Sequence, residues 1–442
     1  MQTLYLATHF DPVYWNTACL IVNSGALDPE KGDSTDYAKI AKAIGAIRQA
    51  GIKVSLADIN NSDFGFTPDP KNNQILFGLK GLLNVGDDIV QTIIDNRPYS
   101  SPRDFLNKVN PGKQAMVALI KSGAFDSMYD RKFMMAWYIW ETCDKKARLT
   151  LQNMGGLIKY NLIPEDEKYQ TAKRVYEFTR YLKARCKYND KYFNLDERAY
   201  HFLEAMDEID LTTTSKDKIL LDAKAWDKVY QSYMNIFRNW ITENKDELLT
   251  ALNSAIFKED WDKYAKGTIS AWEMEVMCFY YHDHELINVN NGKYGLLNFF
   301  EMPTEPVIDR SFPTRNGAII NIFKLSKICG TCIAKDKVKS AISLLTTEGV
   351  VNVKFRKEYF SLFDKRISVK QPDGTKKIVE KSWFDRGSML VVQGYRSEDI
   401  FIPKKYNSSG GHQLYKIDAI LDNGDLILRN QRYQGEEEND EV

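Results

Sequence analysis

The spacing of apolar residues changes once along this chain of 442 residues, close to Pro303, Pro306 and Pro313. Before these prolines, apolar residues recur at helical spacing, most regularly in the aromatic-rich stretch 129–285, which contains few helix breakers. From about residue 315 to residue 433 they alternate instead, in β-branched runs separated by turn dipeptides. The pattern predicts an α+β multidomain protein, with a mostly helical N-terminal two-thirds and a β-rich C-terminal domain.

Composition and breakers divide the chain further, and its length suffices for about two to four domains. The predicted divisions are residues 1–70 (mixed, with a helix over 37–50), 71–128 (short helices broken by Gly, Asn and Pro), 129–300 (a helical domain of unclear role), 315–433 (the β-rich domain) and 434–442 (an acidic tail).

Composition limits the classes of function. Hydrophobic residues make up 43% and charged residues 27%, which is ordinary for a soluble protein. No run of about 18 apolar residues and no signal-peptide pattern occurs, so we expect a cytoplasmic protein that does not contact a membrane. The 60 basic and 60 acidic residues argue against indiscriminate binding to polyanions, but a segregated basic surface could still bind DNA. The single C-x-x-C, Cys329 to Cys332, lacks the second pair that a zinc ribbon needs.

Residues 82–94 predict a short helix, a tight turn at Asn84-Val85-Gly86 and a second helix beginning near Asp87. Helix-hairpin-helix motifs use a Gly-hydrophobic-Gly turn, which exposes backbone N–H groups at a helix N-terminus to a DNA phosphate. Asn84 replaces the first glycine, and asparagine tolerates the left-handed backbone that such a turn requires. The alternative is a plain packing unit with N-capping acids, because Asp87 and Asp88 repel a phosphate.

A second hairpin follows in the same region. Residues 99–106 open a helix, Asn110-Pro111-Gly112-Lys113 makes a turn, and residues 114–122 form the next helix. Gly112 and Lys113 give this turn a phosphate site, and Lys121 is a further candidate for DNA contact.

Several segments also occur in an order and spacing that one family shares. They are Tyr5-Leu6-Ala7-Thr8-His9-Phe10-Asp11-Pro12, residues 51–54 and 58–67, the hairpin stretches 75–94 and 119–126, and residues 272–276 and 280–286. They resemble the C-terminal part of family C replicative DNA polymerases, the bacterial and phage polymerase III alpha kind. Leu56 and Ala57 stand where that family has two prolines, and residues 129–268 match nothing in it.

The resemblance implies a division of labour. The family's palm holds clustered aspartates that bind two Mg²⁺ ions, and its PHP domain holds a metal cluster; neither has a counterpart here, so no catalytic or metal-binding residue is assigned. The chain resembles one piece of a split polymerase, starting at the end of the fingers, with Mg²⁺ expected at the palm of a companion chain. That piece would hold template–primer duplex and single-stranded template.

The β-rich domain is predicted to be an OB barrel, which binds single strands across one face. Candidate strands are residues 318–325, 329–334, 341–346, 350–355, 389–395 and 414–420, with a helix over 356–363 between the fourth and fifth of them. Tyr395, Phe401 and Tyr406 are candidates for stacking on bases.

An insertion at residues 365–381 carries a Pro-Asp-Gly turn and therefore predicts a β-hairpin. Its candidate DNA-binding residues are Lys365, Arg366, Lys370, Lys376 and Lys377, and Lys381 lies at its end. A basic arm beside an OB face suits the backbone of a single strand. The alternative is a solvated hairpin kept soluble by its lysines.

Two further motifs are weaker. His282-Asp283-His284 could bind a metal, but no other ligand cluster lies near it in sequence. Residues 231–237 have the Gln-x-x-hydrophobic-aromatic form of a sliding-clamp peptide, but they lie within a helical run that begins near Trp226, which favours an amphipathic core helix. Besides the split polymerase, two hypotheses stay open: a non-enzymatic DNA-binding accessory or replisome interaction protein that has lost its polymerase partner, and a self-contained nuclease.

Overall fold

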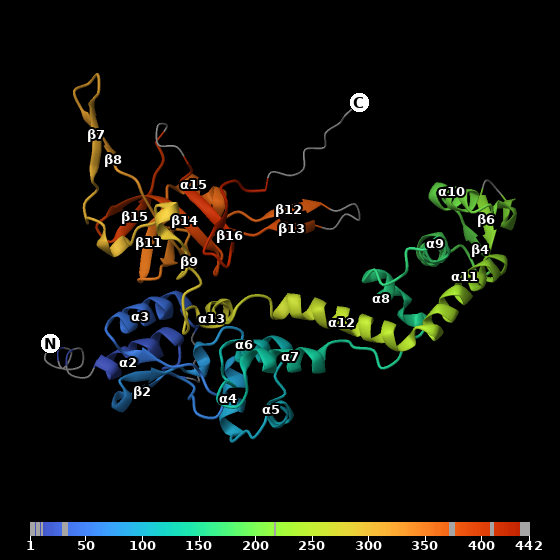
Figure 1. Ribbon diagram of the computed structural model, residues 1–442, viewed down its shortest axis with the longest axis horizontal. Coiled ribbons are helices and arrows are strands. Elements are labelled where there is room, and N and C mark those ends of the chain that lie inside the picture. The colour runs from blue at the N-terminus through green and yellow to red at the C-terminus, as the bar shows by residue number, and fades with distance from the viewer. Residues whose placement is uncertain are drawn as a thin grey trace. The chain divides into compact units, whose positions relative to one another are not determined.

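The computed structural model describes residues 5, 9, 12–28, 34–215, 218–370, 376–406 and 411–433 (Figure 1). The chain divides into two compact units. The first contains Met1–Met135 and Gly267–Val442, and the second is Ala136–Lys266. The tail 434–442 and the Pro-Asp-Gly turn of the predicted β-hairpin lie outside the described residues.

The first unit begins with two helices, α2 (Pro12–Ser24) and α3 (Tyr37–Gln49), which confirms the helix predicted over 37–50. Asp36 caps α3 by accepting a hydrogen bond from the Lys39 N–H, and the isoleucines of α3 lie on one buried face. A small sheet of order β1-β3-β2 follows. Its strands are β1 (Lys53–Val54), β2 (Thr67–Asp69) and β3 (Gln74–Leu76).

The tandem helical hairpins predicted from the sequence are confirmed. The short helix η3 (Leu79–Gly81) leads through a turn to α4 (Asp87–Asp95), and α5 (Pro102–Val109) leads through a second turn to α6 (Lys113–Lys121). Phe105 of α5 meets Tyr99 and Phe125 edge to face, with ring centroids 4.9 and 5.1 Å apart. The second hairpin is therefore held on an aromatic core.

The C-terminal part of the first unit is a closed barrel of five strands. They are β9 (Ser326–Asp336), β10 (Ala341–Leu345), β11 (Val350–Lys354), β14 (Met389–Ser397) and β15 (Ile400–Pro403). They pair in the order β14-β9-β10-β11-β15, and β15 pairs with β14 to close the ring. Only the β11–β15 pair is parallel among these. With α15 (Lys357–Phe363) between the third and fourth strands, this is the predicted OB fold.

Two predicted strand assignments need correction, and one barrel strand was not predicted. Residues 318–325 were expected in the barrel, but β8 (Ile319–Phe323) pairs with β7 (Ile308–Pro313) in a separate two-stranded sheet. Residues 414–420 form β16 (Leu414–Ile420), which lies beside β14 outside the ring and is followed by β17 (Leu426–Arg429). The true fifth strand, β15, was missed because four residues are too few to show alternation.

Large aromatic side chains fill the barrel. Trp383, Phe384 and Phe401 are fully buried, and Phe360 and Phe363 of α15 pack into the same core. The core therefore combines this helix with the inward-facing residues that alternate along the strands. The predicted basic hairpin is confirmed as β12 (Ile367–Lys370) paired with β13 (Lys376–Glu380), and Figure 1 shows it projecting from the barrel.

The second unit is mainly helical. Its helices are the later part of α7 (Arg131–Thr142), then α8 (Met154–Lys159), α9 (Glu167–Tyr181), α10 (Glu197–Ala205), α11 (Ala223–Glu243) and α12 (Lys245–Tyr264). Aromatic side chains of these helices form cores, with Trp226, Phe237 and Trp240 buried. The sequence did not predict a sheet of order β4-β6-β5. Its strands are β4 (Tyr192–Asn194), β5 (Thr212–Ser215) and β6 (Lys218–Asp222).

The chain re-enters the first unit after the second one, and two helices then precede the barrel: α13 (Ile269–Met277) and the short α14 (Asn291–Tyr294). Within the described ranges, none of the helices combines the length and apolar character that crossing a bilayer requires.

Candidate nucleic-acid interface

The turns of the two helical hairpins have the same backbone conformation. Asn84 and Asn110 are both left-handed, with φ of 67° and 47°. Two residues later, Gly86 (φ −74°, ψ 158°) and Gly112 (φ −60°, ψ 155°) are extended and cap the following helices, α4 and α6. Asparagine tolerates positive φ better than other residues with a side chain, which explains its presence at both turns. The prediction that Asn84 preserves the turn is confirmed.

Neither glycine is required by the fold itself. Their dihedral angles suit any residue, and a Cβ built on Gly86 or Gly112 would meet no described atom within 4 Å. A side chain at either position would occupy space directly in front of a helix N-terminus. The first backbone N–H groups of a helix have no intrahelical acceptor, so a phosphate in that space would receive them. Val85, between Asn84 and Gly86, is buried and holds the turn in place.

The two helix starts differ in charge. Helix α4 begins with Asp87 and Asp88. Asp87 is neutralised by Lys80, whose ammonium lies 2.5 Å from its carboxylate, but Asp88 is exposed. Helix α6 begins with Lys113, which is partly exposed, and carries no acid in its first turn. The second turn therefore combines the backbone donors and the positive charge that a phosphate site requires.

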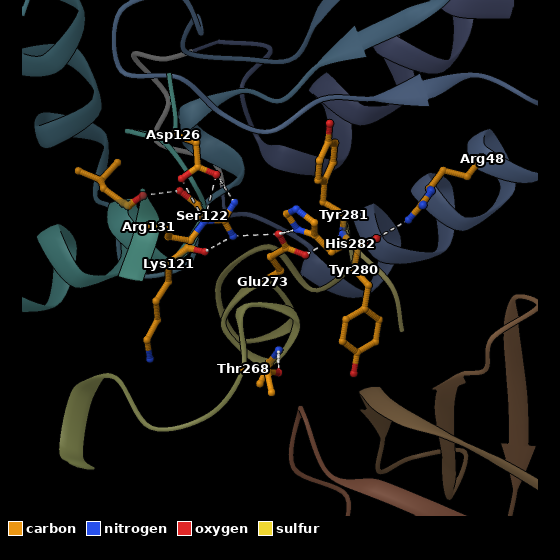
Figure 2. A network of polar contacts seen from close by, with 12 residues as sticks. Arg48, Lys121, Ser122, Asp126, Arg131, Thr268, Glu273, Tyr280, Tyr281 and His282 are labelled. Carbon is orange, nitrogen blue, oxygen red and sulfur yellow. Dashed lines mark hydrogen bonds and ion pairs between the residues drawn. The ribbon is translucent and has the colours of Figure 1, made fainter. Parts of the chain in front are cut away.

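A buried polar network holds the second hairpin (Figure 2). Glu273 of α13 is fully buried and lies 2.8 Å from the guanidinium of Arg131, which also pairs with Asp126 at the end of the hairpin. Glu273 also accepts hydrogen bonds from the N–H groups of Tyr281 and His282 and contacts His282 Nδ1 at 2.6 Å. Burial alone would lower the pKa of Arg131, but hydrogen bonds and charge from Asp126 and Glu273 outweigh it and raise that pKa.

Lys121, a predicted DNA contact, has a structural role instead. Its side chain is 5% exposed, and its ammonium lies 2.5 Å from a carboxylate oxygen of Glu275 on α13. Its carbonyl oxygen accepts a hydrogen bond from Arg131 (Figure 2). The sequence could not reveal this, because Glu275 lies 154 residues away. Lys121 therefore leaves the set of candidate DNA contacts.

A groove of about 930 Å³ lies between α3 and the face of β10 and β11, and the sequence did not predict it. The turn between β9 and β10 forms one wall. Five lysines line it: Lys42, Lys335, Lys337, Lys339 and Lys354. Burial alone would lower the pKa of Lys335, but hydrogen bonds and charge from its partners Asp364 and Asp385 outweigh burial and raise that pKa. OB domains bind oligonucleotides on this face and at this turn.

The basic hairpin carries its cations at the surface. Lys365, Arg366, Lys376 and Lys377 are exposed, as is Lys381 just after β13. For Lys370 the structure describes only the backbone, at the end of β12. None of the five exposed cations forms an ion pair with a described residue.

The base of the basic hairpin is tied to the end of the described chain by Glu380. Its side chain is 4% exposed and accepts hydrogen bonds from Trp383 Nε1 (2.8 Å), Arg432 Nε (3.1 Å) and the Tyr433 N–H (3.0 Å), and it pairs with Arg429. Burial alone would raise the pKa of Glu380. These donors outweigh burial and lower the pKa to about 2.

The three aromatics predicted to stack on bases differ in position. Phe401 is fully buried in the barrel core, so its prediction was wrong. Tyr406 accepts a hydrogen bond from the Phe323 N–H through its hydroxyl. Tyr395 is partly exposed, packs 4.8 Å from Phe323 and lines a pocket of about 330 Å³ beside the β7–β8 hairpin. Tyr406 is also partly exposed, so Tyr395 and Tyr406 both keep a surface that a base could approach.

The histidine and cysteine motifs have structural explanations. His284 Nδ1 accepts from the Leu286 N–H, so Nε2 carries the proton that is donated to the Leu345 carbonyl. Burial lowers the pKa of His284 to about 4. Cys332 lies in the barrel core while Cys329 packs in a separate cluster, and burial raises the pKa of both thiols to about 12. Among the described residues, no group of three or more His, Cys, Asp or Glu side chains could hold a metal.

The segment with the form of a clamp-binding peptide lies inside α11. Met234 and Phe237, its hydrophobic positions, are 2% and 0% exposed and belong to a core of the second unit. This burial matches the helical explanation of the segment.

The fold and the two turns define a tandem helix-hairpin-helix protein with an OB barrel. Residues 51–134 match a family model described as a helix-hairpin-helix motif. The chain is 38% identical over 449 aligned residues to the probable DNA polymerase YorL of Bacillus subtilis (strain 168), with 98% of this chain and 34% of that protein covered. The same values hold for the DNA-directed DNA polymerase of Bacillus phage SPbeta.

The chain is also 34% identical over 142 residues to the DNA polymerase III subunit alpha of Thermus aquaticus, covering 30% of this chain and 11% of that subunit. These comparisons confirm the resemblance to bacterial and phage polymerase III alpha proteins that the sequence motifs predicted. The chain spans about a third of the length of its Bacillus subtilis and phage relatives. It is a DNA polymerase-related chain with a helix-hairpin-helix domain of the DNA-binding kind.

Proposed function

We propose that this chain is the DNA-holding part of a split family C DNA polymerase. In this proposal the helical hairpins bind template–primer duplex through phosphates, and the barrel binds the single-stranded template. The palm that performs nucleotidyl transfer lies on a companion chain, which also carries the PHP domain and, at the palm, the Mg²⁺ ions. The complex would work in the cytoplasm.

One observation carries the duplex part of this proposal. Two turns with matching Asn-x-Gly backbones each place a glycine that the fold does not need in front of a helix N-terminus. Phosphate contacts of this kind hold a duplex without reading its sequence, as a replicative polymerase must. Gly112 and Lys113 are the principal contacts, and Asn84, Val85 and Gly86 form the weaker site.

Charge distribution supports the single-strand part. The lysine-lined groove on the barrel face and the exposed cations of the basic hairpin lie in one domain, although the whole chain has no net charge. A single strand bound there would contact the protein mainly through its backbone, with Tyr395 as a stacking platform. Affinity should therefore fall steeply with salt.

Binding is tested by titrating fluorescent primed duplex and single-stranded oligonucleotide with the chain. Lys376→Gln with Lys377→Gln should weaken single-strand binding by about fivefold and flatten its salt dependence. Lys71→Gln, at an exposed lysine that belongs neither to the two hairpin turns nor to the barrel domain, should change neither. Equal affinities for all three proteins would mean that the DNA path lies elsewhere.

Primer extension with Mg²⁺ and four nucleotides tests the split arrangement. The chain should be inactive alone and active when mixed with a companion chain that bears the palm. Activity of the chain alone would contradict the assignment of chemistry to a companion.

The second candidate is a DNA-binding accessory or replisome interaction protein that has no polymerase partner. The exposed Asp88 at the first turn favours it, because that charge opposes phosphate binding at one of the two hairpins. Intact DNA affinity without extension in any mixture would support this candidate.

A further inference from the structure

The second unit has no net charge, but its charges are segregated along the chain. Residues 136–266 contain 22 basic and 22 acidic residues. Residues 168–191, which form most of α9, the π-helical turn η5 (Leu182–Cys186) and the turn after it, contain eight basic and only two acidic residues. This stretch therefore carries an excess of six positive charges, which the rest of the unit balances. A surface of one sign of charge attracts polyanions even when the whole body is neutral.

The π-helical turn η5 directs two of these cations outward. Its first and last residues, Leu182 and Cys186, are buried in a core of the unit. The three residues between them are all exposed, and they include Lys183 and Arg185. Because both ends of the turn are anchored in the core, these two cations are held at the surface. Turns of this kind are rare and often occur at functional sites.

A tight turn directly after η5 adds two more lysines. Lys187 and Lys191 lie at its two ends, and both are exposed. The Asn189 side chain holds the turn by accepting hydrogen bonds from the N–H groups of Lys191 and Tyr192, at 2.9 and 2.8 Å. Asp190 is the acid in this turn and lies 3.9 Å from the ammonium of Lys187. The turn therefore extends the basic surface that η5 begins.

An exposed tyrosine lies among these cations. Tyr188 is 50% exposed, and the ammonium of Lys218 on β6 lies 4.6 Å from the centroid of its ring. This cation–π contact steadies the ring while half of the residue stays open to solvent. Within the described part of the chain, Lys183, Arg185 and Lys191 form no ion pair. Single strands bind to this combination, because the cations contact phosphates and the ring stacks on a base.

We propose that this basic surface of the second unit is a further binding site for single-stranded DNA. Its residues are Lys183, Arg185, Lys187, Tyr188 and Lys191. The cations bind phosphates and Tyr188 stacks on an unpaired base, so the site binds without sequence preference. DNA is the expected strand because the same chain contains a helix-hairpin-helix domain. The site lies outside the hairpins and the barrel of the proposed function, and it gives a role to the second unit.

The charge part is tested in the full chain by combining Lys183→Gln, Arg185→Gln and Lys187→Gln. This triple variant should bind a fluorescent single-stranded oligonucleotide about fivefold more weakly at about 0.1 M salt. The slope of log affinity against log salt should fall by about two, because three phosphate contacts of a single strand are lost. The control makes the same change in charge at one arginine and two lysines that are exposed elsewhere in the second unit: Arg148, Lys245 and Lys258. Equal losses in both variants would reduce the effect to net charge and overturn the proposal.

The stacking part is tested by photo-cross-linking the full chain to an oligonucleotide that contains 5-iodouracil, followed by peptide mass spectrometry. We expect a cross-link at Tyr188. Tyr188→Leu should abolish this cross-link and weaken single-strand binding about threefold, and Tyr188→Phe should restore the affinity. Blunt duplex of the same length offers no open base face, so Tyr188→Leu should bind it as the unchanged chain does. Cross-links confined to residues outside 136–266 would overturn the site, and an equal loss on duplex would overturn the stacking.

Adding Lys376→Gln and Lys377→Gln to the triple variant separates this site from the barrel of the proposed function. Independent sites contribute additively to the free energy of binding, so the combined loss should be about 25-fold. If only the two barrel changes weaken binding, the site in the second unit is wrong and the barrel site stands. If only the triple change weakens binding, the new site stands and the role of the basic hairpin in the proposed function fails.

Discussion

The two helical hairpins share a backbone and differ in charge. Both turns place asparagine in the left-handed region and an extended glycine two residues later. One helix then starts with Asp87 and Asp88, and the other with Lys113. The comparison teaches that the Asn-x-Gly pattern determines the shape of the turn, while the next residues decide independently whether an anion is attracted there.

The hairpins are also held differently. Helix α4 has the Lys80–Asp87 pair at its start, where Asp87 remains partly exposed. The end of the second hairpin is fixed by Arg131, whose guanidinium bridges Asp126 and the fully buried Glu273. The second hairpin therefore depends more strongly on buried charge, and it is the one with the basic helix start.

Glu273→Ala should have the largest effect on stability, because Glu273 is the fully buried carboxylate that helps to hold the second hairpin. The substitution leaves Arg131 buried with one carboxylate and removes the acceptor of two backbone N–H groups, so we expect a loss of about 3–5 kcal/mol in the free energy of unfolding. Chemical denaturation measures the loss. Asp88→Ala, at the exposed start of the first hairpin, is the control and should change stability by less than about 0.5 kcal/mol. Equal losses would mean that the network does not distinguish the hairpins.

The stability of the basic hairpin should be more sensitive to acid than the stability of the two helical hairpins. The pKa of Glu380 is lowered to about 2 from its ordinary value of 4.5, so its contribution is fully present above pH 4.5 and is lost as pH falls towards 2. The shift corresponds to about 3 kcal/mol. Stability measured by denaturant from pH 6 to pH 2.5 should show a shallower decline in Glu380→Gln than in the unchanged chain. Parallel curves would assign the acid sensitivity to other carboxylates.

Exchanging the charges at the starts of α4 and α6 tests whether these charges decide how strongly each hairpin binds DNA. Lys113→Glu should weaken binding to primed duplex about tenfold and lower its salt dependence, because a phosphate contact becomes repulsive. Asp88→Lys should strengthen binding about threefold, since it gives the first turn the charge of the second. Fluorescence anisotropy at several salt concentrations measures both. If Asp88→Lys has no effect while Lys113→Glu acts as expected, only the second hairpin reaches DNA.

The sequence predicted the features that depend on local chemistry. Turn residues and helix spacing located the tandem hairpins, and alternation located four of the five barrel strands together with α15. Pro-Asp-Gly located the basic hairpin correctly, although the turn itself lies outside the described residues. Each of these signals is contained within about ten residues of the chain.

Features that depend on distant partners could not be predicted. Lys121 resembled a DNA contact because its partner Glu275 is remote in sequence, and the lysine-lined groove requires α3 to lie beside strands some 300 residues later. Phe401 resembled a stacking residue because nothing local shows that its short strand closes the barrel. Charge and aromaticity are visible in sequence, but burial is a property of tertiary contacts.

Alanine in place of the turn glycines should have the smallest effect on duplex affinity, but it is the most specific test of the two turns. Gly112→Ala should leave stability nearly unchanged, since its backbone angles suit alanine and the new Cβ meets no described atom within 4 Å. The methyl group would nevertheless occupy the space where a phosphate approaches the start of α6, so duplex affinity should fall about threefold. Gly86→Ala is the matched control at the acidic turn, where the same methyl group should cost less than half of that. Equal losses at both turns would show that the two hairpins contact DNA alike, and that charge at the helix start matters less than access to the backbone.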